Sequence, residues 1–246
     1  MITLPIAAAL AAATLSTSFI SGIFGMAGGM ILMGILLAFL PLATAMVLHG
    51  LVQMAANGWR AWQWRKHVHW SLVGHYAVGA MAAAACFAAT RAAASQSVVL
   101  IIIGLTPFVG LLLPGRFAPD LGRRAHAWGC GAVCTALQLL AGVSGSILDV
   151  FFVRSNLDRH QQVATKAAVN LLGHTLKVGY FGHLLAGGGE SLSPLAILIA
   201  IALAVAGTHL SRFVLDMMSD AQFRTWSRYV IGAASTVYLI EGFVQL

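Results

Sequence analysis

The chain is a succession of long apolar blocks interrupted by short polar stretches. Apolar runs lie at about 3–21, 69–90, 95–113, 191–211 and 229–246, and each is long enough to cross the roughly 30 Å of hydrocarbon in a bilayer. Shorter apolar pieces lie between these runs, and no polar stretch is long enough for a soluble domain. Because only helices and closed barrels satisfy their backbone groups in lipid, the pattern predicts an all-α polytopic membrane protein.

The composition agrees with this prediction. Hydrophobic residues make up 59% of the 246 residues and charged residues only 9%, which lies outside the range of soluble globular domains. The first apolar run follows no basic stretch of the kind that opens a secretory signal. We therefore expect it to be the first membrane helix, with cleavage as the alternative.

The net charge is +7, and most of the basic residues lie at the ends of the apolar blocks. Four clusters hold ten of the 14 lysines and arginines: Arg65 and Lys66; Arg116, Arg123 and Arg124; Arg154 and Arg159; and Arg212, Arg224 and Arg228. Basic loops remain in the cytoplasm. The clusters thus predict a multi-pass protein of the bacterial inner (plasma) membrane, with cytoplasmic loops near 60–69, 114–125, 154–160 and 212–228. This distribution favours a lipid bilayer as surroundings and argues against a nucleic-acid partner.

The sequence matches itself at a constant offset of 117 residues. The matched pairs are Gly25 with Gly142, Gly28 with Gly145, His49 with Lys166, Gln53 with Asn170, Asn57 with His174 and Arg60 with Lys177. We interpret this as a duplication, with a first repeat at 1–115, a basic cytoplasmic linker at 116–124 and a second repeat at 125–246. Each half has about five hydrophobic elements. An odd number predicts two inverted-topology repeats, as in secondary transporters.

The second element of each half is short. Gly28 to Leu40 and Ser146 to Ser155 are each well under the roughly 20 residues that a spanning helix needs. Each follows a glycine turn, GIFGMAGG or GVSG, so broken or re-entrant helices are expected. Their exposed amide groups attract anions, which makes Gly25, Gly28, Gly29, Gly142 and Gly145 candidates for a binding site. The alternative is that these glycines allow close helix packing.

Two polar helix faces supply the remaining candidates. The residues are His49, Gln53, Asn57 and Arg60 in the first half, and Lys166, Asn170, His174 and Lys177 in the second. Their spacing of three or four residues places each set on one side of a helix. A charge at the centre of a membrane helix costs on the order of 2.5–3.5 kcal/mol. We therefore expect both faces to line a polar path between the halves, where their cations favour a small anion.

Several of these residues have a second interpretation. Arg60 could be an interfacial anchor near Trp62, and Lys166 could form a structural ion pair with Asp149. The functional interpretation of Asp149 is a proton-coupling carboxylate. His49 and His174 could carry protons, because histidine titrates near neutral pH.

The glycine turns and the helices that follow them resemble the TauE/SafE family of sulfite and organosulfonate exporters. The resemblance rests on SGIFGMAGGMILMGILLAFLPLATAMVLHG in the first half and AGVSGSILDVFFVRSNLDRHQQVATKAAVNLL in the second. It implies transport of a small anion, sulfite or a small organosulfonate. Together with the two inverted halves, this predicts an exporter that works by alternating access with the site near the membrane midplane. No cofactor is expected. A homodimer is one assembly that the sequence allows.

Three other functions fit parts of the sequence. An anion channel would have the same composition as a carrier. The GVSG turn at Gly142–Gly145 resembles the turn that presents the serine of rhomboid proteases, which would make Ser144 a nucleophile. Nine histidines suggest a metal transporter, but a path with two lysines and one carboxylate disfavours cations. Cys130 and Cys134 share a helix face, where ordinary packing is the expected role and metal binding the alternative.

Overall fold

The computed structural model describes residues 4–24, 26–91, 94–112, 119–152, 155, 157–186 and 193–244. The elements are α1 (Leu4–Phe24), α2 (Met26–Phe39), α3 (Leu42–Gln63), η1 (Arg65–His67), α4 (Trp70–Thr90), α5 (Gln96–Leu112), α6 (Arg124–Ala141), α7 (Gly145–Phe152), α8 (Arg159–Ala186), α9 (Pro194–Met217) and α10 (Asp220–Val244). Every element in this part of the chain is a helix, so the predicted all-α class is confirmed.

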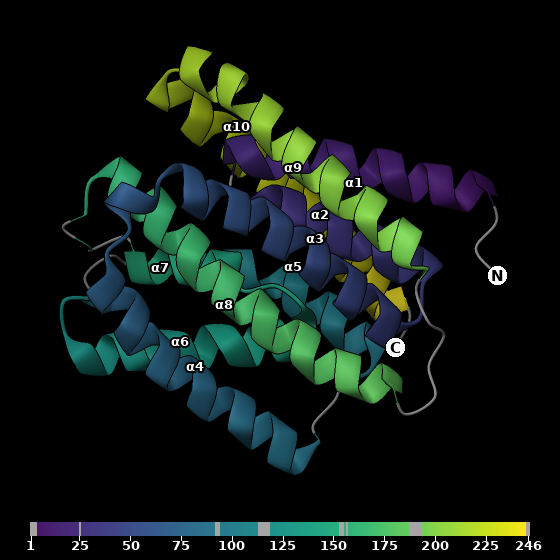
Figure 1. The fold of residues 1–246 in the computed structure, drawn as a ribbon, viewed down its shortest axis with the longest axis horizontal. Helices are drawn as coiled ribbons and strands as arrows, with labels where there is room; N and C mark the ends of the chain where they lie inside the picture. Colours follow the sequence, from purple (N-terminus) through teal and green to yellow (C-terminus); the bar gives the residue numbers. More distant parts are fainter. Residues whose placement is uncertain are drawn as a thin grey trace.

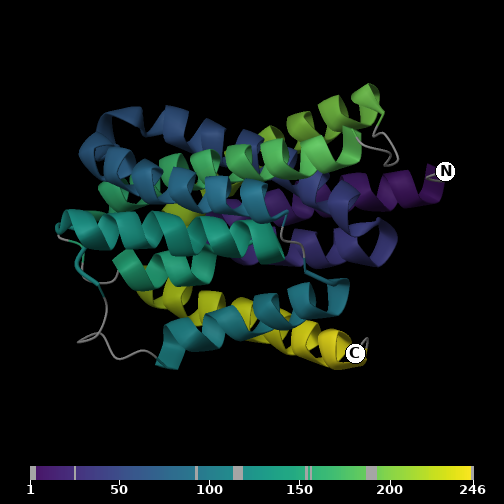
Figure 2. The same cartoon turned by 90° about the horizontal axis from the view of Figure 1, so that it is seen from below.

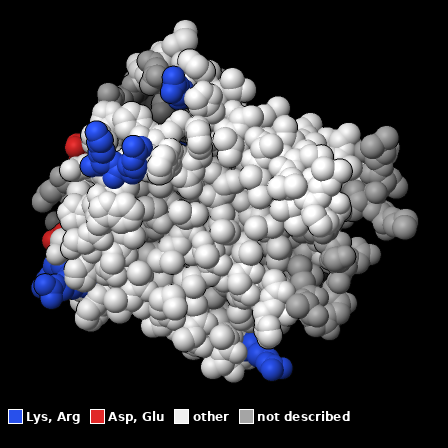
Figure 3. All heavy atoms as spheres, viewed as in Figure 1, with Lys and Arg blue, Asp and Glu red and all other residues white. Residues whose placement is uncertain are grey.

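Within the described residues, three helices are long and apolar enough to cross a membrane by length and composition. The spans are Pro5–Phe24, Trp70–Thr90 and Pro194–Val214. Shorter apolar helices lie at Ala27–Phe39, Gln96–Phe108 and Tyr229–Val244. Across the centre of the face in Figure 3, none of the described atoms belongs to a charged side chain. Such a surface suits contact with lipid.

Local sequence explains where several helices begin and end. At the start of α8, Asp158 Oδ1 accepts a hydrogen bond from the Gln161 amide, and Gln161 Oε1 accepts one from the Asp158 amide. Ser219 and Gln222 form the same reciprocal pair at the start of α10. Each pair satisfies amides that have no partner inside the helix. At the other end of a helix, Gly142 ends α6 with a left-handed φ of 78°, which glycine adopts without strain.

The predicted short second elements are confirmed. α2 has 14 residues and α7 has 8, whereas a spanning helix needs about 20. α7 directly follows the turn after Gly142, and a single residue separates the end of α1 from the start of α2. Gly25, the glycine predicted at that junction, lies outside the described residues.

The helices pair across the two halves of the sequence. α1 packs beside α9, α4 beside α6, α3 beside α8, and α5 beside α10 (Figures 1 and 2). At an offset of 117 residues, α1 corresponds to α6 and α4 to α9, so the first two pairs are equivalent to each other. The two halves are therefore intertwined and do not form separate bodies.

α3 and α8 run antiparallel. His49 of α3 contacts Lys177 of α8, whereas Trp64, which directly follows α3, stacks on His160 at the start of α8. Equivalent helices that run in opposite directions are what an inverted repeat requires. The observation supports that prediction, and the inversion itself stays a prediction.

Glycines permit the closest helix crossings. A Cβ on Gly131 of α6 would lie 2.0 Å from the Tyr76 carbonyl oxygen of α4, and one on Gly79 would lie 1.8 Å from the Trp128 carbonyl oxygen. In the equivalent pair, Gly207 of α9 lies similarly close to the backbone of α1 at Leu15. At these crossings the glycines serve packing, as they commonly do in membrane helices.

Loops that carry predicted cytoplasmic clusters meet at one end of the bundle. Arg65 and Lys66 of η1 adjoin the start of α8, where Trp64 and His67 both stack on His160. Leu72 near the start of α4 packs in one cluster with Leu121 and Ala127 near the start of α6. In Figure 3, most of the visible basic side chains lie toward this end, and one lies apart lower in the view. Which side of the membrane this end faces remains a prediction.

Candidate functional site

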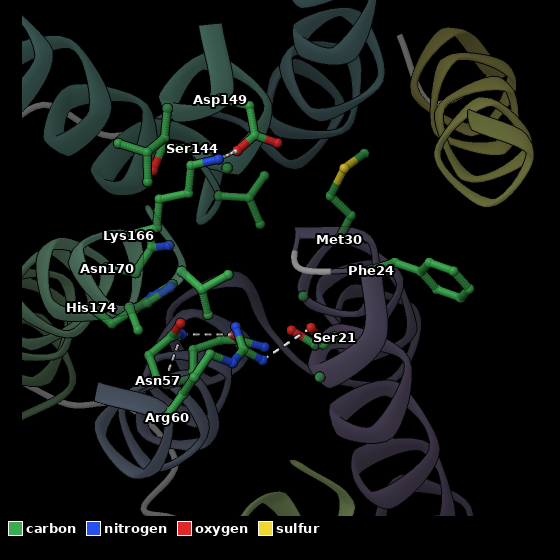
Figure 4. A pocket seen from close by; sticks show the side chains of 18 of the residues that line it. Ser21, Phe24, Met30, Asn57, Arg60, Ser144, Asp149, Lys166, Asn170 and His174 are labelled. Atoms are coloured by element: carbon green, nitrogen blue, oxygen red, sulfur yellow. Dashed lines mark hydrogen bonds and ion pairs between the residues drawn. The ribbon is translucent and has the colours of Figure 1, made fainter. Parts of the chain in front are cut away.

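A cavity of about 500 Å³ lies between α1, α2, α3, α7 and α8. Most of the predicted site residues line it: His49, Gln53, Asn57 and Arg60 from α3; Lys166, Asn170 and His174 from α8; Gly29 from α2; and Gly145 and Asp149 from α7. Figure 4 shows Lys166, Asn170 and His174 on one side of the open space, with Ser21 and Met30 across from them. The two predicted polar faces therefore meet at one cavity.

The cavity is open at one end and closed at the other. At the open end Trp64 is 38% exposed and Val163 42%. At the closed end Gln53 is 4% exposed, His174 5% and His49 fully buried. The open end is the one that bears the basic loops.

Lys166 and Asp149 form an ion pair inside the cavity. Lys166 Nζ lies 2.7 Å from Asp149 Oδ1, and the ammonium also lies 5.1 Å from the centre of the Phe152 ring. The ion pair that the sequence offered as an alternative role for Lys166 is present. Both side chains keep part of their surface exposed toward the cavity, 26% for Lys166 and 46% for Asp149.

Gln53 presents a buried amide N–H₂ group at the cavity. Asn57 Nδ2 donates to Gln53 Oε1 at 3.3 Å and to the Gln53 carbonyl oxygen at 2.9 Å. This fixes the amide with Nε2 toward Gly29, where a Cβ would lie 3.2 Å from that nitrogen. Gln53 Nε2 is buried and has no hydrogen-bond acceptor among the described residues.

His174 presents a second unpartnered donor. Gln138 Nε2 lies 3.3 Å from His174 Nε2, and because an amide nitrogen can only donate, His174 Nε2 accepts. The proton of the neutral ring is then on Nδ1, which is buried without a partner in the described part of the chain. Buried donors without acceptors are costly, so these groups suit a ligand rich in acceptors.

Arg60 faces the cavity near its open end and donates from Nη2 to the Ser21 carbonyl oxygen at 3.0 Å (Figure 4). Ser21 belongs to the last turn of α1, whose carbonyl oxygens have no partner within the helix. A different side chain stacks on the interfacial Trp62, namely Arg65, at 4.5 Å from the ring centre. Arg60 therefore caps α1 and does not act as the interfacial anchor that the sequence offered as its alternative role.

Lys177, Gly28 and Gly142 do not line the cavity. Lys177 is fully buried beneath its closed end, where Nζ lies 2.7 Å from His49 Nδ1 and 3.0 Å from the Gly142 carbonyl oxygen. A Cβ on Gly28 would lie 1.9 Å from the Thr17 carbonyl oxygen of α1, so Gly28 serves helix packing. Gly25 lies outside the described residues.

The described residues do not form the serine protease site or the metal site that the sequence suggested as alternatives. Ser144 Oγ has no histidine within hydrogen-bond reach in the described part of the chain, and a serine nucleophile needs such a base. Among the same residues no group of three or more His, Cys, Asp or Glu side chains could hold a metal ion. The Cys130 and Cys134 sulfurs lie 4.0 Å apart, and both side chains are fully buried.

The structure adds lining residues that the sequence interpretation missed. Ser21 supplies the carbonyl oxygen bound by Arg60, and Trp64 and His160 stack at the open end with ring centres 5.0 Å apart. The offset could have drawn attention to Ser21, because it pairs with Gln138, the partner of His174. Nothing in the helical spacing brings Trp64 next to His160, because the contact depends on how α3 and α8 pack.

The fold and the cavity define a class: a polytopic α-helical membrane protein with a cationic, donor-rich cavity among broken helices. The family model described as sulfite exporter TauE/SafE matches residues 10–239 of the chain. The chain belongs to the TauE/SafE family, a family of membrane transporters. Comparisons with curated proteins and with solved structures give no match.

Proposed function

We propose that the protein is an exporter of a small anion, sulfite or a small organosulfonate, and that the cavity binds it near the membrane midplane. One observation carries the proposal. Lys166 lies in the same cavity as two buried donors for which the described part of the chain offers no acceptor, Gln53 Nε2 and His174 Nδ1. A cation combined with directional donors matches an oxyanion, which accepts several hydrogen bonds and carries charge.

Asp149 has a defined part in this proposal. Its carboxylate occupies the face of Lys166 at 2.7 Å, where the oxygen of a substrate would otherwise bind. An incoming anion therefore competes with Asp149 for the ammonium. Once displaced, the carboxylate loses its counter-charge, and protonation relieves the repulsion between the two anions. Asp149 is thus the proposed proton-coupling residue, and the anion moves together with a proton.

The remaining residues supply hydrogen bonds and shape. Asn57 holds the Gln53 amide in its donating orientation, while Gly29 leaves room beside Nε2. Asn170 lines the same wall as Lys166 and His174. Rocking of the two halves would expose the site to each side in turn. A membrane potential that is negative inside favours outward movement when the anion and its proton together carry net negative charge, as a sulfite dianion with one proton does.

Uptake of sulfur-labelled sulfite into proteoliposomes tests the proposal. Purified protein should give saturable uptake, and unlabelled sulfite or a small organosulfonate should inhibit it more strongly than chloride does. Uptake that rises linearly with concentration would indicate a channel. Uptake equal to that of empty liposomes, with protein shown to be folded, would remove sulfite as a substrate.

A further inference from the structure

Lys177 is the most deeply buried charged side chain in the described part of the chain, and the cavity does not reach it. Its exposed fraction is zero, and no carboxylate lies within ion-pair distance of it among the described residues. Its two partners are His49 Nδ1 and the Gly142 carbonyl oxygen. Burying a cation without a counter-charge costs folding free energy. A lysine at this position therefore suggests a functional role.

The contacts of Lys177 continue into a chain of hydrogen bonds. His49 Nε2 lies 2.9 Å from the Gly29 carbonyl oxygen, which can only accept, so Nε2 carries the proton and Nδ1 accepts from Lys177. The chain runs from Gly29 in the first turn of α2, through His49 of α3 and Lys177 of α8, to Gly142 at the end of α6. It therefore ties together the two places where the helices break, one in each half of the sequence.

Arg60 and Lys177 are equivalent at the offset of 117 residues. Each donates to a carbonyl oxygen at the C-terminal end of the first helix of its own half, Ser21 in α1 for Arg60 and Gly142 after α6 for Lys177. Arg60 nevertheless faces an open cavity, whereas Lys177 is buried. The two equivalent residues, Arg60 and Lys177, therefore have different environments in this structure.

A second pair of equivalent residues also differs in exposure. Trp64 is equivalent to Phe181 at the offset of 117 residues. Trp64 is 38% exposed at the mouth of the cavity, and Phe181 is 3% exposed. Phe181 belongs to a buried cluster that includes Met33 and Met46, and the sulfurs of both methionines lie against Gly142. Methionine side chains repack easily, so this cluster can close the Phe181 end of the path and rearrange when that end opens.

Helix geometry places Lys177 on the same path as Lys166. The two lysines are eleven residues apart on α8, which is close to three full turns and about 16 Å along the helix axis. They therefore lie on one side of the helix, Lys166 in the open cavity and Lys177 beyond its closed end.

From these relationships we infer that the Gly29–His49–Lys177–Gly142 hydrogen-bond chain is a closed gate. When it opens, Lys177 becomes the ligand of the anion in a second state that is open at the Phe181 end. The identity of the ligand rests on the proposed function, whereas the gate rests on the contacts and the offset. In the second state Lys177 stands in the environment that Arg60 has here.

Cysteine labelling tests the gate without any substrate. The parent protein for this test carries Cys86→Ser, which removes the exposed native cysteine. Trp64→Cys and Phe181→Cys are then introduced into this parent, one at a time. Right-side-out and inverted vesicles are treated with a membrane-impermeant maleimide. Trp64→Cys should react from the side of the basic loops and Phe181→Cys from the opposite side.

The Lys177→Met substitution keeps an unbranched side chain, one atom shorter than lysine, and removes both hydrogen bonds. It should raise the labelling rate at Phe181→Cys by at least about tenfold, because at least one net hydrogen bond to a charged group is lost from the closed state. Labelling at Trp64→Cys should fall. Lys66→Met, at an exposed lysine of η1, is the matched control and should change neither rate. Lys177→Gln, which retains one donor, should give an intermediate rate and replaces Lys177→Met if that variant does not fold.

Two results would overturn the gate: an unchanged Phe181→Cys rate in a folded Lys177 variant, or labelling of both cysteines from the same side. The role of Lys177 as a ligand has a separate readout. Sulfite should slow labelling at Phe181→Cys in the parent and have no effect in Lys177→Met. Labelling that responds to Lys177→Met but never to sulfite would leave the gate standing and contradict the proposed substrate.

Discussion

Lys166 Nζ lies 2.7 Å from Asp149 Oδ1, inside the cavity that both residues line. The pair joins the longest helix of the second half to the short α7, and it is partly exposed toward the cavity. A partly solvated ion pair contributes about 0–1 kcal/mol, so a second anion can compete with the carboxylate. The lysine is therefore both neutralised at rest and available to a substrate.

Opposite effects are expected from removing the two partners. Asp149→Asn removes the internal competitor, so the concentration of sulfite that gives half-maximal uptake should fall by about fivefold, and dependence on an inward proton gradient should disappear. Lys166→Gln removes the cation and should raise that concentration by about tenfold to a hundredfold. Uptake measured with and without a pH gradient checks both. If uptake by Asp149→Asn depended on the proton gradient as strongly as uptake by the parent, Asp149 would not be the residue that couples proton movement to anion transport.

Gln53→Glu tests the unpartnered amide with almost no change in shape. The variant keeps an oxygen to accept from Asn57 and places a second oxygen where Nε2 now faces Gly29. It should lose sulfite uptake by about a hundredfold or more, because an anion replaces a donor to an anion. Gln53→Met should lose less, about tenfold, and should be no less stable than the parent, because it removes a buried group that has no partner among the described residues. Uptake together with thermal unfolding of the purified proteins separates these outcomes, and a Gln53→Glu variant that transports normally would place the substrate elsewhere.

Gly29→Ala probes the space beside the same amide. Its Cβ would lie 3.2 Å from Gln53 Nε2, which is tight enough to displace the donor but not the backbone. Sulfite affinity in uptake assays should fall about threefold to tenfold, as for one weakened hydrogen bond. Gly58→Ala on α3 is the control, because its Cβ would meet only the Leu171 side chain at 3.6 Å. Equal affinities in the two variants would contradict the placement of Gln53.

The crossing of α4 and α6 should tolerate no side chain at Gly131. A methyl group there would lie 2.0 Å from the Tyr76 carbonyl oxygen, and such overpacking costs about 1–3 kcal/mol or more. Gly129→Ala, two residues away on the same helix, meets nothing within 4 Å and should leave stability unchanged or slightly raised. Thermal unfolding in detergent compares the two. A Gly131→Ala protein as stable as the parent would show that the helices do not approach as closely as described.

Much of the fold could be predicted from the sequence because membrane-spanning helices are recognised by their length and apolar composition. The short α2 and α7 could be predicted as well, since each follows a glycine turn and is too short to span. The polar faces on α3 and α8 followed from three- and four-residue spacing. These are local properties of the chain, and helix geometry fixes them before any packing occurs.

The details of the site required the packing of distant helices. Spacing alone put Lys177 on the same face as Lys166, but only the approach of α3 to α8 shows that its partner is His49. The sequence could not decide between an anion ligand and an ion pair for Lys166, because Asp149 is seventeen residues away and its distance in space depends on the turn between α7 and α8. Gly28 shows the converse, since its sequence context suggested an anion site and its contact with Thr17 shows helix packing.

The central claim is that Lys166 binds an anion carried through this cavity, and counterflow tests it most directly. Proteoliposomes loaded with unlabelled sulfite are diluted into a trace of labelled sulfite, and internal label is followed for the parent, Lys166→Gln and the control Lys66→Gln. The account predicts a transient accumulation of label above equilibrium for the parent and for Lys66→Gln, and none for Lys166→Gln. Accumulation by Lys166→Gln equal to that of the parent would contradict it.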